Sequence, residues 1–172
     1  MGKRKGFYGW AGIKYFLYEY ELSKMERSGQ QKVEWELFIR NDKDRVSIEH
    51  IFPQKATHES WKSTFTDVPE SEYYVQSGSL GNLLPLSLSI NSSLQNDPYA
   101  EKKKPKFNYK NEKIRNGYAD GSHSEIEVAL KYHNWTPETI KERGLSLLNF
   151  MEERWQIDLG DESEKLTLLQ LK

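Results

Sequence analysis

Two short apolar runs followed by a helix start restrict the fold of this chain more than any other feature of its sequence. The first run, Val46 to Phe52, is followed by Pro53, which cannot donate a hydrogen bond within a strand. The second run, Leu83 to Leu88, leads into Ser89, a residue type that caps helix N-termini. The order predicts strand, connection, strand and helix, with the helix extending from about residue 90 to about Lys104, before Pro105.

Amphipathic segments on both sides of this core predict helices. In residues 10–27 the apolar side chains recur at helical spacing up to Ser28-Gly29, and Thr136-Pro137-Glu138 is a strong start for a helix reaching about Gln156. A shorter helix is expected from His123 or Ser124. The fold class is therefore α+β, with a small strand–strand–helix core embedded in a mostly helical domain. Less regular expectations are a short helix or strand at 33–39, a turn at 41–44 and a loop at 69–79.

The length of 172 residues favours one compact domain. We expect it to comprise an N-terminal helical lead-in (1–45), the core (46–105) and a C-terminal helical region (106–172). The chain has no cysteine, which excludes disulfides and thiolate metal sites and agrees with a reducing cytoplasm. No apolar run approaches the roughly 20 residues that a membrane span needs. Any metal must therefore be held by oxygen and nitrogen atoms.

The charge distribution favours a phosphate-rich partner despite a net charge of only −1. Residues 101–115 carry a net +5, so the rest of the chain carries −6. A concentrated basic segment on an acidic protein can still dock onto DNA. We expect DNA contacts from Lys102, Lys103, Lys104 and Lys106; the alternative is a solvated lysine-rich loop.

Four residues of the core have side chains suited to phosphodiester chemistry. Glu49 and His50 end the first expected strand, Asn82 stands at the start of the second, and Asn91 lies nine residues later in the first turn of the helix. Carboxylate and amide oxygens are hard ligands that favour Mg²⁺ or Mn²⁺. The ordinary pKa of histidine lies near the working pH, which suits a general base.

This arrangement resembles the HNH, or ββα-metal, nuclease motif, and Glu49-His50-Ile51-Phe52-Pro53-Gln54 is similar to the version found in CRISPR effector nucleases, with Glu49 in place of Asp. The resemblance implies that Glu49 and Asn91 hold the metal and that His50 activates water. It also implies that Asn82 is not a ligand and instead braces the loop that orients His50.

A longer pattern resembles the C-terminal HNH domain of GmrSD-type modification-dependent restriction enzymes and their phage-defence relatives. It comprises Leu17 to Glu21, Ser47 to Gln54, Trp61, Leu80 to Leu84, Asn91, Asn96, Tyr99, Lys102, Trp135, Ile140, Arg143 and Trp155. The resemblance implies a bacterial, cytoplasmic endonuclease that nicks or cuts DNA, including modified phage DNA. It also implies a ParB-like nucleotide-hydrolysing domain on the same or a partner chain. Pro85 departs from the pattern and requires an edge strand or a bulge.

Several residues have two interpretations that the sequence leaves open. Gln54 either braces the loop after Pro53 or is exposed, and Asn96 either braces the helix or contacts phosphate. Arg143 either pairs with a buried acid or points at phosphate. We expect His58, His123 and His133 to be structural or surface residues, and Trp61, Trp135 and Trp155 to lie in the core.

Two other functions remain open from the sequence. A catalytically silent module that docks onto DNA or a partner protein would use the same scaffold and the same basic segment. An RNA-cutting HNH toxin is the third alternative, against which the flanking matches to the defence family speak.

Overall fold

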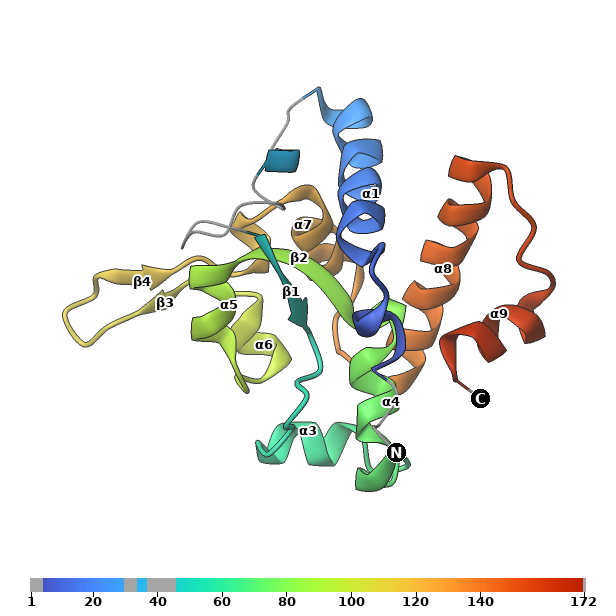
Figure 1. Cartoon of the computed structure of the whole chain (residues 1–172). Coiled ribbons are helices and arrows are strands. Elements are labelled where there is room, and N and C mark those ends of the chain that lie inside the picture. Colours follow the sequence, from blue (N-terminus) through green and yellow to red (C-terminus); the bar gives the residue numbers. More distant parts are fainter. Residues whose placement is uncertain (1–4, 30–33, 37–45, 172) are drawn as a thin grey trace. The chain divides into compact units, whose positions relative to one another are not determined.

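The computed structural model describes residues 5–29, 34–36 and 46–171 (Figure 1). The turn expected at 41–44 lies outside the described residues. Of the element expected at 33–39, only residues 34–36 are described. The chain forms two compact units from interleaved segments. Unit 1 comprises residues 1–13, 50–83 and 135–172, and unit 2 comprises residues 14–49 and 84–134.

Unit 1 is a helical assembly around an aromatic cluster. Its helices are α3 (Glu59–Thr64), α4 (Tyr73–Gly78), α8 (Pro137–Trp155) and α9 (Glu162–Leu169), with 3-10 turns at Gly6–Gly9, Glu70–Glu72 and Leu80–Asn82. The ring of Phe52 stacks on that of Phe65 at 3.9 Å and meets Trp61 edge-on at 5.6 Å. Trp61 and Trp135 are buried as expected, whereas Trp155 is exposed and the prediction for it was wrong.

Unit 2 contains most of the two-stranded sheet formed by β1 (Val46–His50) and β2 (Leu83–Ser87). Its other elements are α1 (Ile13–Ser28), α5 (Leu88–Leu94), α6 (Tyr99–Lys102), β3 (Lys106–Phe107), β4 (Lys113–Arg115), a 3-10 turn at Tyr118–Asp120 and α7 (His123–Lys131). The chain crosses from unit 2 to unit 1 after Glu49, near the end of β1, and from unit 1 to unit 2 after Leu83, at the start of β2.

The sheet is antiparallel. Ser47 Oγ donates to Leu86 O, and Ile51 N donates to Asn82 O, so partner numbers fall along β2 as they rise along β1. In a two-stranded sheet each strand is an edge strand, which explains how Pro85 is accommodated in β2. The strand–strand–helix order expected from the sequence is present as β1, β2 and α5, and the fold class is α+β.

The two best-marked helix starts behave as expected because their caps are local. Ser122 and Glu125 form a reciprocal capping box at the start of α7. Thr136 accepts a hydrogen bond from Thr139 N at the start of α8, and Pro137 occupies the first turn. The helix α8 ends at Trp155, and the left-handed conformation of Gln156 closes its last turn.

Two expectations about the backbone were wrong. The loop expected at 69–79 is helical in large part, since it forms the 3-10 turn Glu70–Glu72 and the helix α4. Gly78, at the end of α4, packs so closely on Lys5 that a Cβ there would lie 2.7 Å from Lys5 O. The single helix expected from about 90 to 104 is divided into α5 and α6. Pro98 cannot continue a helix from preceding residues, and Gln95 adopts a positive φ of 36°. Asn91 and Lys102 consequently do not share a helix face.

Among the described residues, no helix is both long enough and apolar enough to cross a membrane.

Candidate active site

The side chain of Asn82 holds the segment that follows His50. In unit 1 its Oδ1 accepts from Phe52 N (2.7 Å) and Trp135 Nε1 (3.0 Å), while its Nδ2 donates to Phe52 O (2.9 Å) and Ser77 O (3.0 Å). These bonds use both lone pairs and both N–H groups of the amide, which is 0 % exposed. The geometry matches the expected bracing residue and leaves no amide lone pair for a cation. Its part in catalysis stays a prediction.

A buried arginine holds the backbone on either side of Asn82. Arg143 Nη1 on α8 donates to Gly81 O (2.7 Å) and Leu83 O (2.9 Å). Because the side chain is buried, it is not exposed for the phosphate contact that we considered from the sequence. α8 also approaches this turn closely: a Cβ on Gly81 would overlap the carbonyl oxygen of Ile140. A glycine is therefore required at position 81, between the 3-10 turn and α8.

His50 is the last residue of β1 and belongs to unit 1. Its imidazole is half-buried and packs against Tyr8, with the ring centroids 4.3 Å apart and the planes inclined by 57°. Tyr8 lies in the N-terminal 3-10 turn, far from His50 in the sequence, and no motif indicated this contact. The contact restricts the orientations available to the imidazole.

Glu49, expected as a metal ligand, lies in a buried polar cluster of unit 2. Its carboxylate is 3 % exposed, and Oε1 accepts from Lys102 Nζ at 2.7 Å and from Tyr118 Oη at 2.9 Å. Burial, reinforced by the nearby charge of Glu49, raises the pKa of Tyr118 well above its ordinary value, so the phenol remains a hydrogen-bond donor. The sequence carried no signal for the contribution of Tyr118.

Lys102 requires a correction. It was expected on the surface in contact with DNA, but its side chain is 0 % exposed and its ammonium group neutralises Glu49. An ammonium that is buried against a carboxylate is not available to phosphate while that ion pair persists. The division of the expected helix at Pro98 allows this placement, because it frees α6 from the axis of α5.

Asn91, in α5, lies against β1 within unit 2. Its Nδ2 donates to Ser47 Oγ (2.8 Å) and to Ile48 O (3.2 Å). Ser47 and Glu49 are two residues apart in an extended strand, so their side chains leave the same face of β1. Asn91 thus contacts the face of β1 that also carries Glu49. These two acceptors hold the amide nitrogen in place, which fixes the orientation of the amide oxygen.

The oxygen atoms of Glu49 and Asn91 are chemically suited to a hard divalent cation. Two observations limit how they would hold one. Oε1 of Glu49 is already shared by Lys102 and Tyr118, and the described residues contain no cluster of three or more acidic, histidine or cysteine side chains able to bind a metal. A cation here would therefore rely on few protein ligands and on water.

The remaining candidates have different environments. Gln54 is exposed and Asn96 is half-buried between α5 and α6. Lys103 donates to the carbonyl oxygens of Tyr132 and His133 at 3.4 and 3.3 Å. Lys104 and Lys106 are exposed, and Lys106 also donates to Asp97 at 3.3 Å. Of the four lysines expected to bind DNA, these last two have the most accessible side chains.

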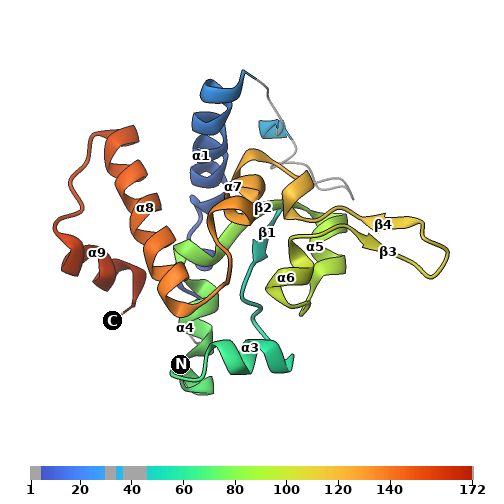
Figure 2. The same ribbon diagram turned by 180° about the vertical axis from the view of Figure 1, so that it is seen from behind.

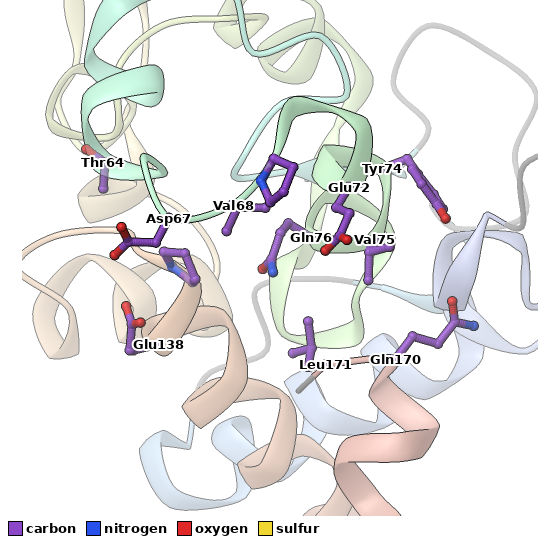
Figure 3. A pocket seen from close by; sticks show the side chains of 12 residues that line it. Thr64, Asp67, Val68, Glu72, Tyr74, Val75, Gln76, Glu138, Gln170 and Leu171 are labelled. Carbon is purple, nitrogen blue, oxygen red and sulfur yellow. The ribbon is translucent and has the colours of Figure 1, made fainter.

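A cavity of about 480 Å³ in unit 1 is separate from all of these residues (Figure 3). It is lined by parts of α3, α4, the start of α8 and the C-terminal residues Gln170 and Leu171. Figure 3 shows the carboxylates of Asp67, Glu72 and Glu138 among its lining side chains. Three carboxylates would repel a phosphate backbone, so the cavity does not suit DNA.

Comparison with known protein families matches residues 3–150 to the family described as GmrSD restriction endonucleases, C-terminal domain. The matched range takes in most of the chain, including Glu49, His50, Asn82 and Asn91. No curated protein and no solved structure matches the chain.

Proposed function

The chain belongs to the family of GmrSD restriction endonuclease C-terminal domains, and on that premise we propose that it cuts or nicks DNA as an HNH-type endonuclease. In this proposal His50 is the general base, Glu49 and Asn91 hold one Mg²⁺ or Mn²⁺ ion, and Asn82 positions the loop that carries His50. DNA is the substrate that membership of a restriction endonuclease family implies.

One observation carries the proposal beyond family membership: the buried hydrogen bonds of Asn82 to both backbone polar groups of Phe52, two residues after His50. A general base works efficiently only when its geometry is maintained, since small displacements cost large factors in rate. Asn82 uses its full hydrogen-bonding capacity, and Arg143 fixes the backbone beside it. So much buried polar structure around a short loop is consistent with a loop that must be rigid.

The proposed chemistry begins with a water molecule that gives a proton to the imidazole of His50 as its oxygen attacks phosphorus. The P–O bond to the 3′ oxygen breaks, leaving a 5′ phosphate. When bound, a divalent cation would stabilise the negative charge that develops on the phosphoryl and leaving oxygens. Glu49 and Asn91 would hold that cation. Without the cation, Lys102 neutralises Glu49; with the cation bound, Lys102 and the cation would share the Glu49 carboxylate.

We also propose the biological setting that the family suggests. The domain would act on phage DNA, including modified DNA, in a bacterial cytoplasm. A ParB-like nucleotide-hydrolysing domain on the same or a partner chain would supply nucleotide and modified-base sensing. Purification of the domain with and without such a partner, followed by plasmid cleavage with and without nucleotide, tests this part.

One observation favours a second candidate, a catalytically silent docking module. The charge of Glu49 is already neutralised by Lys102 inside the protein, as in a purely structural ion pair. Such a module would bind DNA and leave it intact.

Incubation with supercoiled plasmid decides between the two candidates. Wild-type protein with Mn²⁺ or Mg²⁺ should nick or linearise the plasmid, and a chelator should prevent this. His50→Ala should lower the rate by about 10²-fold or more while circular dichroism and Mn²⁺ binding remain close to wild type. His133→Ala is the matched control, because His133 is an exposed histidine that lies outside the motif in the sequence.

If His50→Ala cuts at the parental rate, the assignment of the general base is wrong. Gel retardation without nicking under every metal condition would support the docking module instead. Cleavage of RNA but not of DNA would contradict the proposed substrate.

A further inference from the structure

The basic segment after α6 is an ordered β-hairpin rather than a solvated loop. β3 and β4 pair antiparallel, with Lys106 opposite Arg115 and Phe107 opposite Lys113, and the register shifts between the two pairs. In unit 2 the hairpin extends beyond α5 and α6 in both views (Figures 1 and 2). We name residues 106–115 the basic hairpin.

The basic hairpin exposes apolar side chains. Tyr109 at its tip is 92 % exposed, Ile114 is 61 % exposed and Phe107 is 49 % exposed. Isolated exposed apolar residues are common, but three on one short ribbon are a concentration typical of interaction surfaces. Packing within unit 2 leaves these three side chains exposed, so it does not explain why they are apolar.

The tip of the basic hairpin is held in one conformation by Asn108. Its Oδ1 accepts from the backbone N–H of Lys110 (2.9 Å) and of Glu112 (3.0 Å), and its Nδ2 donates to the Glu112 carboxylate (2.8 Å). Asn111 supplies the left-handed residue of the turn at φ 62°. Tyr109 therefore projects from a structured tip, which lowers the entropy cost of using it in binding.

The base of the basic hairpin is anchored by Arg115. Its Nη1 donates to the carbonyl oxygens of Lys104 and Asn116, and its Nη2 donates to Asp97 at 2.9 Å. Arg115 is buried, so this cation serves structure rather than binding. The hairpin is thus fixed at both ends and resembles a rigid arm.

The exposed charges of the arm are mostly positive. Lys106, Lys110 and Lys113 are exposed, and exposed Lys104 lies just before the arm. The arm has a single exposed carboxylate, that of Glu112, which accepts a hydrogen bond from Asn108. Lys110 also lies over the ring of Tyr109, at 5.6 Å from its centroid. A ribbon that combines lysines with aromatic rings is complementary to nucleic acid, because lysines can contact phosphates and aromatic rings can contact bases.

We propose that the basic hairpin is the arm by which this domain docks onto duplex DNA, with its tip in the major groove, Tyr109 against base edges, and Lys106, Lys110 and Lys113 on phosphates. The proposal rests on the proposed function for its substrate. Besides Lys106, which the sequence already indicated, it assigns DNA binding to Tyr109, Lys110 and Lys113, which the sequence did not single out.

Dimensions favour the major groove. That groove is about 12 Å wide and admits a two-stranded ribbon, whereas the minor groove is only about 6 Å wide. The chain takes three residue steps from Lys106, at the base of the hairpin, to Tyr109 in the turn, a reach of at most roughly 10 Å, which is comparable with the groove depth of about 8.5 Å. The tip can therefore reach the groove floor while the flanking lysines remain at the level of the phosphates.

Fluorescence anisotropy with a labelled 20-base-pair duplex, in the presence of a chelator so that no cutting occurs, tests the proposal on the full chain. Tyr109→Ala should weaken binding on the order of 10-fold, and Tyr109→Phe should restore most of the loss. The double variant Lys110→Gln/Lys113→Gln should reduce the slope of log K against log salt by roughly 1.8, because each phosphate contact contributes about 0.9.

Tyr74→Ala and Lys62→Gln are the matched controls, since both residues are exposed in unit 1, outside the hairpin. They should leave affinity and salt slope unchanged. Thermal unfolding should be unaffected in all hairpin variants, because their side chains are exposed.

The outcomes separate this inference from the proposed function. Unchanged binding in every hairpin variant, or no duplex binding by the wild type, overturns the inference even if the protein cuts DNA. Loss of binding in hairpin variants of a protein that cuts no DNA supports the inference and refutes the nuclease. Tighter binding to a single strand than to the duplex, or competition by a minor-groove ligand, overturns the groove assignment.

Discussion

Replacing Asn82 by alanine should destabilise unit 1 more than any ordinary substitution of a polar residue. The change removes four buried hydrogen bonds and leaves four backbone or indole groups without their partner: Phe52 N, Phe52 O, Ser77 O and Trp135 Nε1. A buried polar group left unsatisfied costs about 1–3 kcal/mol, and water entering the new space would offset part of that cost. Taking about 1 kcal/mol for each group, we expect a loss of about 4 kcal/mol.

Equilibrium unfolding in urea, followed by tryptophan fluorescence, measures this loss directly, since Trp61 and Trp135 both lie in unit 1. For a chain of this length, about 4 kcal/mol corresponds to a fall of roughly 8–16 °C in Tm. Asn149→Ala is the matched control, because this exposed amide on α8 accepts one exposed hydrogen bond from Lys165. It should change stability by less than about 0.5 kcal/mol.

The isosteric variant Asn82→Asp makes the test sharper. A carboxylate would still accept from Phe52 N and Trp135 Nε1, but it would place negative charge against two carbonyl oxygens that now receive hydrogen bonds. We expect it to be at least as unstable as the alanine variant at pH 8 and to recover as the pH falls and the acid becomes a donor. An alanine variant within 1 kcal/mol of wild type, or an aspartate variant insensitive to pH, would refute the reasoning.

Two further predictions concern the buried charges of unit 2. Lys102→Met should lower the free energy of unfolding by about 3–5 kcal/mol, because it leaves the buried carboxylate of Glu49 without its counter-ion. The double variant Glu49→Gln/Lys102→Met should lose less stability than the single variant. Urea unfolding of the three proteins measures both effects, and a single variant as stable as wild type would contradict the ion pair. Burial, opposed by hydrogen bonds from Ser122 and reinforced by two nearby carboxylates, raises the pKa of Glu125 from 4.5 to about 7. Because the folded pKa lies above the unfolded one, the stabilisation from the protonated carboxyl is complete below about pH 4.5 and is lost as the pH rises through 7. Glu125→Gln, which stays neutral, should remove a pH-dependent loss on the order of 3 kcal/mol between pH 4.5 and 8.5, and parallel stability profiles for variant and wild type would show this cause to be wrong.

Local features of the sequence were sufficient for much of the fold. The capping residues Ser122 and Thr136 start α7 and α8 where they were expected, because a cap and the N–H groups it binds lie within one turn. The two strands were recognisable from their apolar runs and from Pro53. Pro98 was an equally local signal, and neglect of it produced the error of one long helix instead of α5 and α6.

The candidate site could be predicted from the sequence only in part. The longer pattern that includes Glu49, His50, Asn82 and Asn91 indicated the GmrSD family, which the comparison with family models confirms. The spacing also suggested that Asn82 braces the chain, and its bonds to Phe52 match that suggestion. It carried no signal for Tyr8 or Tyr118, which contact His50 and Glu49.

What the sequence by itself determined is the strand–strand–helix order of the core and the residue types of the motif, because both are expressed over a few neighbouring residues. Only the tertiary structure decided that Lys102 is an internal counter-ion of Glu49, 53 positions away, and that Arg143 holds the turn at Gly81. It also turned a run of lysines into a rigid arm. Such pairings depend on which distant segments meet when the chain closes on itself, and spacing along the chain does not encode that.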